Sequence, residues 1–177
     1  GPNTGHSFFS ITLLMNVTIL IRCDASSTIG YGHLIRCQAL AKKLVQISGW
    51  RVIFAMVQTR EVAENIRENG LETKIPDKIL GKEFSEDEWL FEILFQEKIN
   101  ILILDVRSEL KQETLIDIRK NGVLIVSIDD QSERRLTADL VFCPPVPQVK
   151  RVSWKGFTGK LYSGWDYVIL RDEFTKS

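Results

Sequence analysis

The chain has no net charge, few cysteines and no long apolar run, and each absence excludes a class of protein. Its 177 residues carry 23 basic and 23 acidic side chains, so composition gives no electrostatic reason to expect nucleic acid or an anionic membrane as a partner. The three cysteines, Cys23, Cys37 and Cys143, have neither metal-ligand nor CxxC spacing. We therefore expect reduced, buried thiols, a cytoplasmic protein and a small-molecule partner.

The amino-terminal segment lacks the features of a targeting signal. Gly1-Pro2 resembles the scar of a protease cleavage, and Met15 is a plausible natural start. No basic residue precedes the apolar run 8–15 and no small-residue cleavage site follows it, which argues against a signal peptide. The run reaches Arg22 too soon to span a bilayer. We expect residues 1–14 to be a scar and leader.

Apolar periodicity predicts alternating strands and helices from residue 17 onward. The run 101–104 is apolar on both faces, which is typical of a parallel strand covered by helices on both sides. Three expected helices end at glycine, and Ser85 with Glu88 forms a capping box. The expected fold is α/β, a doubly wound, mostly parallel, Rossmann-like sheet. The expected strands are 17–23, 51–57, 72–75, 101–106, 123–129 and 139–143, and the expected helices are 32–48, 61–69, 85–98 and 109–121.

The length of the chain and its last thirty residues indicate one domain that ends near a domain boundary. At 177 residues the chain is long enough for one well-buried domain and short for two. Residues 146–160 show no clear periodicity, and 164–174 are aromatic, apolar and abruptly terminal. We expect a single α/β domain over 15–160 and an interdomain segment over 161–177, with a second lobe absent.

The stretch from Asp24 to His33, DASSTIGYGH, is the most informative part of the chain. It joins an apolar strand to an amphipathic helix, and in an open α/β sheet that place lies beyond the carboxyl end of a strand, where ligands bind. Free N–H groups and the helix dipole there favour an anion such as phosphate. Gly30-x-Gly32 lacks the third glycine of a dinucleotide fingerprint and the Lys-Ser/Thr pair of a P-loop.

His33 stands in the first turn of the helix that follows this glycine turn. A helix amino-terminus opposes protonation and lowers the pKa of a histidine, which leaves a neutral imidazole able to accept a proton from water. The alternative is a histidine that only packs or caps the helix. Arg36 lies three residues further on, where it could meet a phosphate, pair with Asp24 or remain a solvated helix arginine.

Other polar residues follow the expected strands. Asp24 is a candidate to orient a sugar or a neighbouring side chain, whereas Ser26 and Ser27 could equally be turn-formers. Asp105 and Asp129-Asp130 end adjacent strands, where carboxylates hold sugar hydroxyls or cap helices; for Asp129-Asp130 we favour a structural role. The basic residues Lys150, Arg151, Lys155 and Lys160 are interpreted as a solvated loop.

Residues 21–41, IRCDASSTIGYGHLIRCQALA, resemble the amino-terminal signature of the nucleotide-sugar hydrolases of pseudaminic acid synthesis and of relatives in spore-coat polysaccharide synthesis. The resemblance extends to Asp105, Asp129-Asp130 and 164–174. It implies the amino-terminal half of a two-lobed glycosyltransferase-B fold, in an enzyme that releases UDP from UDP-2,4-diacetamido-2,4,6-trideoxy-altropyranose by attack of water, with inversion and without metal or cofactor.

Carried over position by position, the resemblance makes His33 the catalytic residue. It implies substrate binding by Asp24, Ser26, Ser27, Gly30, Gly32, Arg36, Asp105 and Arg107. Family members commonly have tyrosine where this chain has Arg107, and asparagine near Cys143, so the identity of the sugar stays open. The nucleotide would be held mainly by the absent lobe, so we expect weak activity or none from this half alone. The alternatives are a glycosyltransferase of the same fold and a non-catalytic nucleotide-sugar-binding domain.

Overall fold

The computed structural model describes residues 17–24, 32–57, 60–77, 84–105, 110–143 and 152–163, except the side chains of residues 32, 33, 47 and 48. Strands and helices alternate along these residues, as the periodicity predicted. In chain order they are β1 (Thr18–Cys23), α2 (Gly32–Ser48), β2 (Arg51–Ala55), α3 (Arg60–Glu68), β3 (Glu72–Lys74), α4 (Glu86–Gln96), β4 (Ile101–Asp105), α5 (Gln112–Lys120), β5 (Leu124–Ile128), the 3₁₀ helix η1 (Glu133–Thr137), β6 (Leu140–Cys143) and β7 (Lys160–Ser163).

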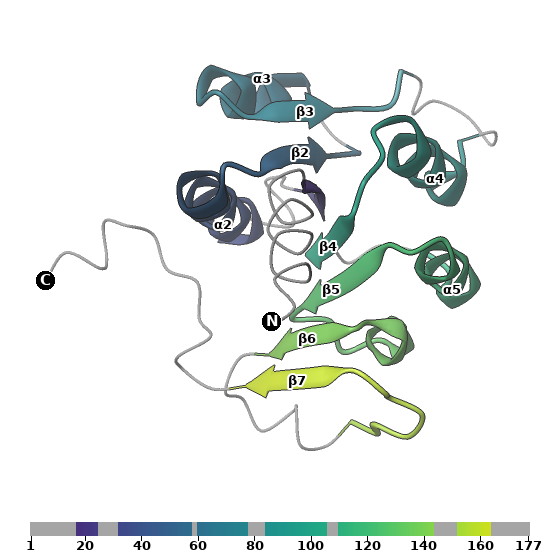
Figure 1. Ribbon diagram of the computed structural model, residues 1–177. Helices are drawn as coiled ribbons and strands as arrows, with labels where there is room; N and C mark the ends of the chain where they lie inside the picture. The colour runs from purple at the N-terminus through teal and green to yellow at the C-terminus, as the bar shows by residue number, and fades with distance from the viewer. Residues whose placement is uncertain are drawn as a thin grey trace, which may run out of the picture.

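The strands form one sheet of seven in the order β3-β2-β1-β4-β5-β6-β7, and all neighbours are parallel (Figure 1). The register places Cys23, the last residue of β1, opposite Asp105, the last residue of β4. Strand order reverses at β1, since β2 and β3 extend the sheet to one side of it and β4 to β7 to the other. The β1–β4 pair is thus the topological switch point of a doubly wound sheet.

Two hydrophobic cores lie on opposite faces of this sheet. One packs Leu90 and Ile93 of α4 and Leu115 of α5 against alternate residues of the strands. The other packs Leu34 and Cys37 of α2 and Ile66 of α3 against the remaining strand residues. Figure 1 shows α2 on one side of the sheet and α4 and α5 on the other, and the packing of Ile66 places α3 on the same face as α2. Helices on both faces explain why the central strands are apolar on both sides.

Local signals in the sequence are confirmed at the helix ends. Gly49, Gly70 and Gly122, which follow α2, α3 and α5, have φ values of 67°, 79° and 85°. A Cβ atom at these positions would meet nothing within 4 Å, so the backbone conformation rather than space favours glycine. The Ser85 hydroxyl accepts a hydrogen bond from the Glu88 N–H at 3.3 Å and caps α4.

Two elements were not expected from the sequence. The 3₁₀ helix η1 precedes β6, and β7 extends the sheet beyond it through main-chain pairing of Leu140–Cys143 with Lys160–Ser163. The boundary that we placed after residue 160 falls inside β7, so the sheet continues at least to Ser163. The expected leader, residues 1–14, and residues 164–177 of the expected interdomain segment lie outside the described residues.

Candidate functional site

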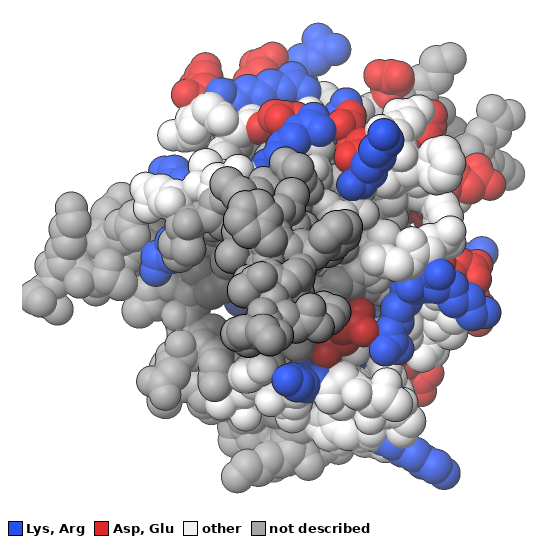
Figure 2. Space-filling model, viewed as in Figure 1, with Lys and Arg blue, Asp and Glu red and all other residues white. Residues whose placement is uncertain are grey.

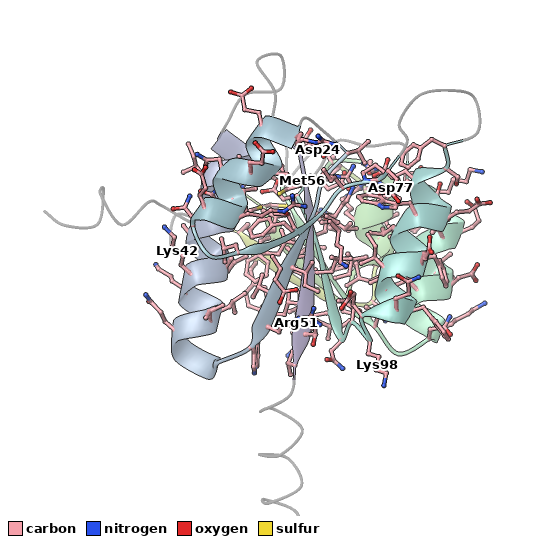
Figure 3. All side chains as sticks on the ribbon, turned by 90° about the horizontal axis from the view of Figure 1, so that it is seen from above. Asp24, Lys42, Arg51, Met56, Asp77 and Lys98 are labelled. Carbon is pink, nitrogen blue, oxygen red and sulfur yellow. The ribbon has the colours of Figure 1, made fainter. Side chains whose placement is uncertain are left out.

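The carboxyl ends of β1 and β4 form the centre of the candidate site. β1 is followed by α2 on one face of the sheet, and β4 is followed by α5 on the other, so the connections diverge from adjacent strands. In α/β proteins, ligands bind where the connections from adjacent strands diverge in this way. Figure 3 shows Asp24 at this edge, with Arg51 and Lys98 at the opposite edge of the sheet.

On the α4 face the site is built around Arg22, whose side chain is 1% exposed. Its Nη1 and Nη2 donate to the two carboxylate oxygens of Asp24 at 2.6 and 2.9 Å, and its Nε donates to Glu86 at 2.9 Å. Nη1 also reaches the carbonyl oxygens of Cys23 and Ala55, at 3.2 and 3.3 Å. Arg22, Asp24 and Glu86 are named the Arg22 cluster below.

The Arg22 cluster joins the ends of three elements. Asp24 Oδ1 also accepts the Val57 N–H at 2.9 Å, which ties the chain after β1 to the chain after β2. Glu86 is the first residue of α4, and the Trp89 ring of the same helix lies 5.7 Å from the Arg22 guanidinium carbon. Burial disfavours the charged form of Arg22, but the hydrogen bonds and charges of Asp24 and Glu86 outweigh burial and raise its pKa.

On the α2 face the site is built around Asp105, which is also 1% exposed. Arg36 of α2 binds it with two hydrogen bonds, Nη2 to Oδ1 at 2.5 Å and Nε to Oδ2 at 2.9 Å. The thiol of Cys37 donates to Oδ2 at 3.2 Å. Arg36, Asp105 and Cys37 are named the Arg36 cluster. Their contacts attach the second turn of α2 directly to the end of β4.

Contacts in the Arg36 cluster raise the pKa values of Arg36 and Cys37. Burial works against the charge of Arg36, but the hydrogen bond and the charge of Asp105 raise its pKa. A hydrogen bond with the Cys23 thiol, burial and the Asp105 carboxylate together hold the pKa of Cys37 well above its usual value. The thiol therefore stays protonated and donates to Asp105 rather than acting as a nucleophile. All three cysteines are free and buried, as expected from their spacing.

Aspartates at the end of β5 have local roles. The Asp130 carboxylate accepts the Ser132 N–H at 2.8 Å and lies 3.3 Å from Arg134 Nε. Asp129 has a positive φ of 53°, and its N–H donates to the carbonyl of Phe142 at 2.8 Å. These contacts form the turn into η1, in agreement with the structural role favoured from the sequence.

The expected site residues fall into two groups in this structure. Asp24, Arg36 and Asp105 lie together at the switch point, and Gly32 and His33 begin α2 there, with side chains outside the described set. Ser26, Ser27, Gly30 and Arg107 lie outside the described residues. Arg36 is bound to Asp105, not to Asp24 as one interpretation of the sequence suggested, because Arg22 binds Asp24 on the opposite face of the sheet.

Arg22, Glu86 and Cys37 were not recognised as site residues from the sequence. A signal for Arg22 is present: an arginine inside the buried run Ile19–Cys23 requires compensating carboxylates. Glu86 is separated from Arg22 by 64 residues, and sequence alone gives no means of pairing them.

Within the described ranges, no group of three or more His, Cys, Asp or Glu side chains could hold a metal ion. A search of the same residues finds no helix with the length and apolar character needed to cross a bilayer. On the face seen in Figure 2, the described basic and acidic atoms are interspersed, without a large patch of one sign.

Comparison with solved structures identifies the fold class. The chain is similar to S. aureus MnaA in complex with UDP, with a TM-score of 0.60 and 14% identity over 83% of this chain and 43% of that one. It is also similar to a glycosyltransferase from Rickettsia africae, with a TM-score of 0.54 and 12% identity over 84% and 42% of the two chains. These likenesses confirm a Rossmann-like lobe of the glycosyltransferase-B type.

Sequence comparison narrows the class. No protein-family model matches the chain. The UDP-2,4-diacetamido-2,4,6-trideoxy-beta-L-altropyranose hydrolase of Campylobacter jejuni is 28% identical over 160 residues, which are 88% of this chain and 53% of that protein. The resemblance stated from residues 21–41 is therefore confirmed. The chain spans about half the length of the relatives it matches, and it is related to enzymes that act on nucleotide sugars.

Proposed function

We propose that the chain is the amino-terminal lobe of a nucleotide-sugar hydrolase. Its substrate is a UDP-diacetamido-trideoxyhexose, and its products are UDP and the free sugar, for nonulosonic acid or surface polysaccharide synthesis. The similarity to the C. jejuni hydrolase is the observation that carries this proposal. The switch-point geometry supports it, because α2 begins at Gly32-His33 beside the ends of β1 and β4.

In the proposed reaction, a water oxygen attacks the anomeric carbon as the bond from that carbon to the UDP oxygen breaks. UDP leaves with the bonding electron pair, and His33 accepts the proton of the attacking water. Attack opposite the leaving group inverts the anomeric centre. A position at the amino-terminus of a helix favours the neutral imidazole, which is the form that can act as a base. Such a base contributes a factor of about 10²–10⁴ to the rate.

We further propose that the chain after β7 leads to a second lobe that holds most of the nucleotide, and that the protein works in the cytoplasm. Coverage of about half of each relative supports a missing lobe. The 177-residue chain should accordingly bind UDP weakly and release little of it from a UDP-sugar. Calorimetry with UDP and a UDP-release assay on this chain measure both properties, and rapid turnover by the chain alone would contradict the two-lobed proposal.

The direct test uses the product of the complete gene, incubated with a UDP-diacetamido-trideoxyhexose and no acceptor. UDP and free sugar should appear in equal amounts. The His33→Asn variant should lose about 10²–10⁴-fold in kcat, because it removes the base. Unchanged kcat in that variant would remove His33 from the mechanism, and ligand binding with no turnover by the unsubstituted protein would indicate a non-catalytic binding domain.

A glycosyltransferase is the second candidate, because the Rickettsia glycosyltransferase shares the fold. In that case His33 would deprotonate an acceptor hydroxyl instead of water. UDP release that depends on an added acceptor would favour transfer, whereas release without one favours hydrolysis.

A further inference from the structure

We propose that Arg36 and Asp105 are positioning residues rather than substrate ligands: they fix the start of α2 against the end of β4 and thereby set where position 33 stands at the switch point. The inference rests on the proposed function for its kinetic consequence. It differs from what the resemblance implied, since both residues were expected to bind substrate.

The burial of Asp105 is the first argument. Both carboxylate oxygens accept hydrogen bonds within the protein, Oδ1 from Arg36 and Oδ2 from Arg36 and Cys37, and the side chain is 1% exposed. Because so little of the carboxylate is exposed, a sugar hydroxyl could reach it only if the groups that bury it, Arg36 among them, moved away. Asp105 is thus occupied by α2.

The placement of Arg36 is the second argument. It lies three residues after His33, on a neighbouring part of the same helix surface. Two parallel N–H···O bonds fix the orientation of a guanidinium as well as its distance, which a single contact does not. Any tilt of the first turns of α2 would break this geometry.

Anchoring to both strands of the switch point is the third argument. Cys37, the residue after Arg36, donates to Asp105 on β4 and lies in the same hydrophobic core as Cys23 on β1. Cys23 and Asp105 are register partners. The start of α2 is therefore attached to the two strand ends between which the substrate is proposed to bind, and a hydrophobic contact through Leu34 supports the same turn.

The kinetic test compares Arg36→Met, Arg36→Lys and Asp105→Asn in the product of the complete gene. A positioning role predicts that kcat falls about 10–100-fold with KM nearly unchanged, since misplacement by about 1 Å of a reacting group has effects of this size. Arg36→Lys keeps the charge but loses the two-bond geometry, so it should resemble Arg36→Met more than the unsubstituted protein. A rise in KM with unchanged kcat would make these residues substrate ligands and overturn the proposal.

The control is Arg51→Met. Arg51 makes an equally two-bonded pair with Glu72, at 2.9 and 2.7 Å, at the opposite edge of the sheet, so its loss should leave kcat and KM unchanged. Should Arg36→Met fail to fold, Arg36→Lys and Cys37→Ala report on the same contacts.

A second measurement separates this proposal from the proposed hydrolysis. In the ¹⁵N-labelled 177-residue chain, amide resonances of residues 32–35 should shift in Arg36→Met and in Asp105→Asn, and should stay in place in Arg51→Met. This readout needs no substrate. If the unsubstituted protein proves inactive while these amides shift, the hydrolase assignment fails and the positioning role stands. If neither the amides nor kcat respond, the positioning role fails.

Discussion

The Arg22 cluster and the Arg36 cluster use the same chemistry on opposite faces of one sheet, yet their surroundings differ. Both pair an arginine with an aspartate at the end of a central strand through two hydrogen bonds. Arg22 is 1% exposed and also binds Glu86 and two carbonyl oxygens, whereas Arg36 is 23% exposed and is carried by a helix.

This difference indicates what each cluster does. Arg22 joins β1, the end of β2 and the start of α4, all of which belong to the framework of the sheet. Arg36 joins the framework to the second turn of α2, directly after the turn that carries His33. Loss of Arg22 should therefore affect chiefly the stability of the fold, and loss of Arg36 chiefly the geometry at the proposed catalytic position.

The largest expected effect is that of Arg22→Met. The substitution leaves the carboxylates of Asp24 and Glu86, which are 12% and 18% exposed, without their cation. Removing one partner of a buried ion pair costs about 3–5 kcal/mol in the free energy of unfolding. Urea denaturation at pH 7 measures this loss. The control is Arg51→Met, which removes an exposed ion pair and should lower the free energy of unfolding by about 1 kcal/mol or less. Equal losses in the two variants would contradict the distinction between a framework cluster and a surface pair.

Arg36→Met should cost less stability than Arg22→Met. The side chain is partly solvated, and a shift of α2 can bring water to Asp105, so we expect a loss of about 1–3 kcal/mol. The same urea series measures it. A loss larger than that of Arg22→Met would reverse the assignment of the two clusters.

Cys37→Ala sharpens the comparison through a single hydrogen bond. The variant loses the thiol donor to Asp105, whereas Cys143→Ala removes a similarly buried thiol to which no described residue gives a hydrogen bond. Cys37→Ala should be the less stable of the two by about 1 kcal/mol, the net value of one such bond. Thermal unfolding of both variants checks this, and equal midpoints would mean that the thiol contact contributes nothing.

The smallest expected effect is the contribution of the Arg51–Glu72 pair to the pH dependence of stability. The hydrogen bond from Arg51 lowers the pKa of Glu72 below its ordinary 4.5. A carboxylate with a lowered pKa stabilises the fold above its ordinary pKa, and this stabilisation is lost as the pH falls through the lower value. Glu72 is 51% exposed, so the amount is below about 0.5 kcal/mol. Between pH 6 and pH 3, Glu72→Gln should lose slightly less stability than the unsubstituted chain, and a larger loss would contradict the sign.

Much of the fold follows from local signals, and the unexpected parts have physical reasons. Central strands such as Ile101–Asp105 carry their own evidence, because burial on both faces requires continuous apolar runs. β7 has the sequence KLYS and is mostly exposed, so nothing in its composition distinguishes it from a loop; its pairing with β6 depends on main-chain hydrogen bonds.

The places of three candidate residues in the fold were predicted from the sequence, but the pairing of their side chains was not, and their roles in binding or catalysis stay predictions. Asp24, Arg36 and Asp105 were located correctly at strand ends and a helix start, because parallel strands end at one edge. Which arginine binds which aspartate depends on the face of the sheet to which each side chain points. Arg22 shares the face of Leu20, and Asp105 that of Ile103, and these faces were assigned only by the packing of α4 and α2. Roles of residues in the glycine turn stay predictions.

The central claim is that water attacks the anomeric carbon with His33 as base, and an isotope experiment tests it most directly. The product of the complete gene is incubated with its UDP-sugar in H₂¹⁸O, and the products are analysed by mass spectrometry. We predict one ¹⁸O atom at the anomeric position of the free sugar, none in UDP, and loss of this labelling in His33→Asn. Label in the phosphate of UDP, or labelling that is equally fast in His33→Asn, would contradict the account.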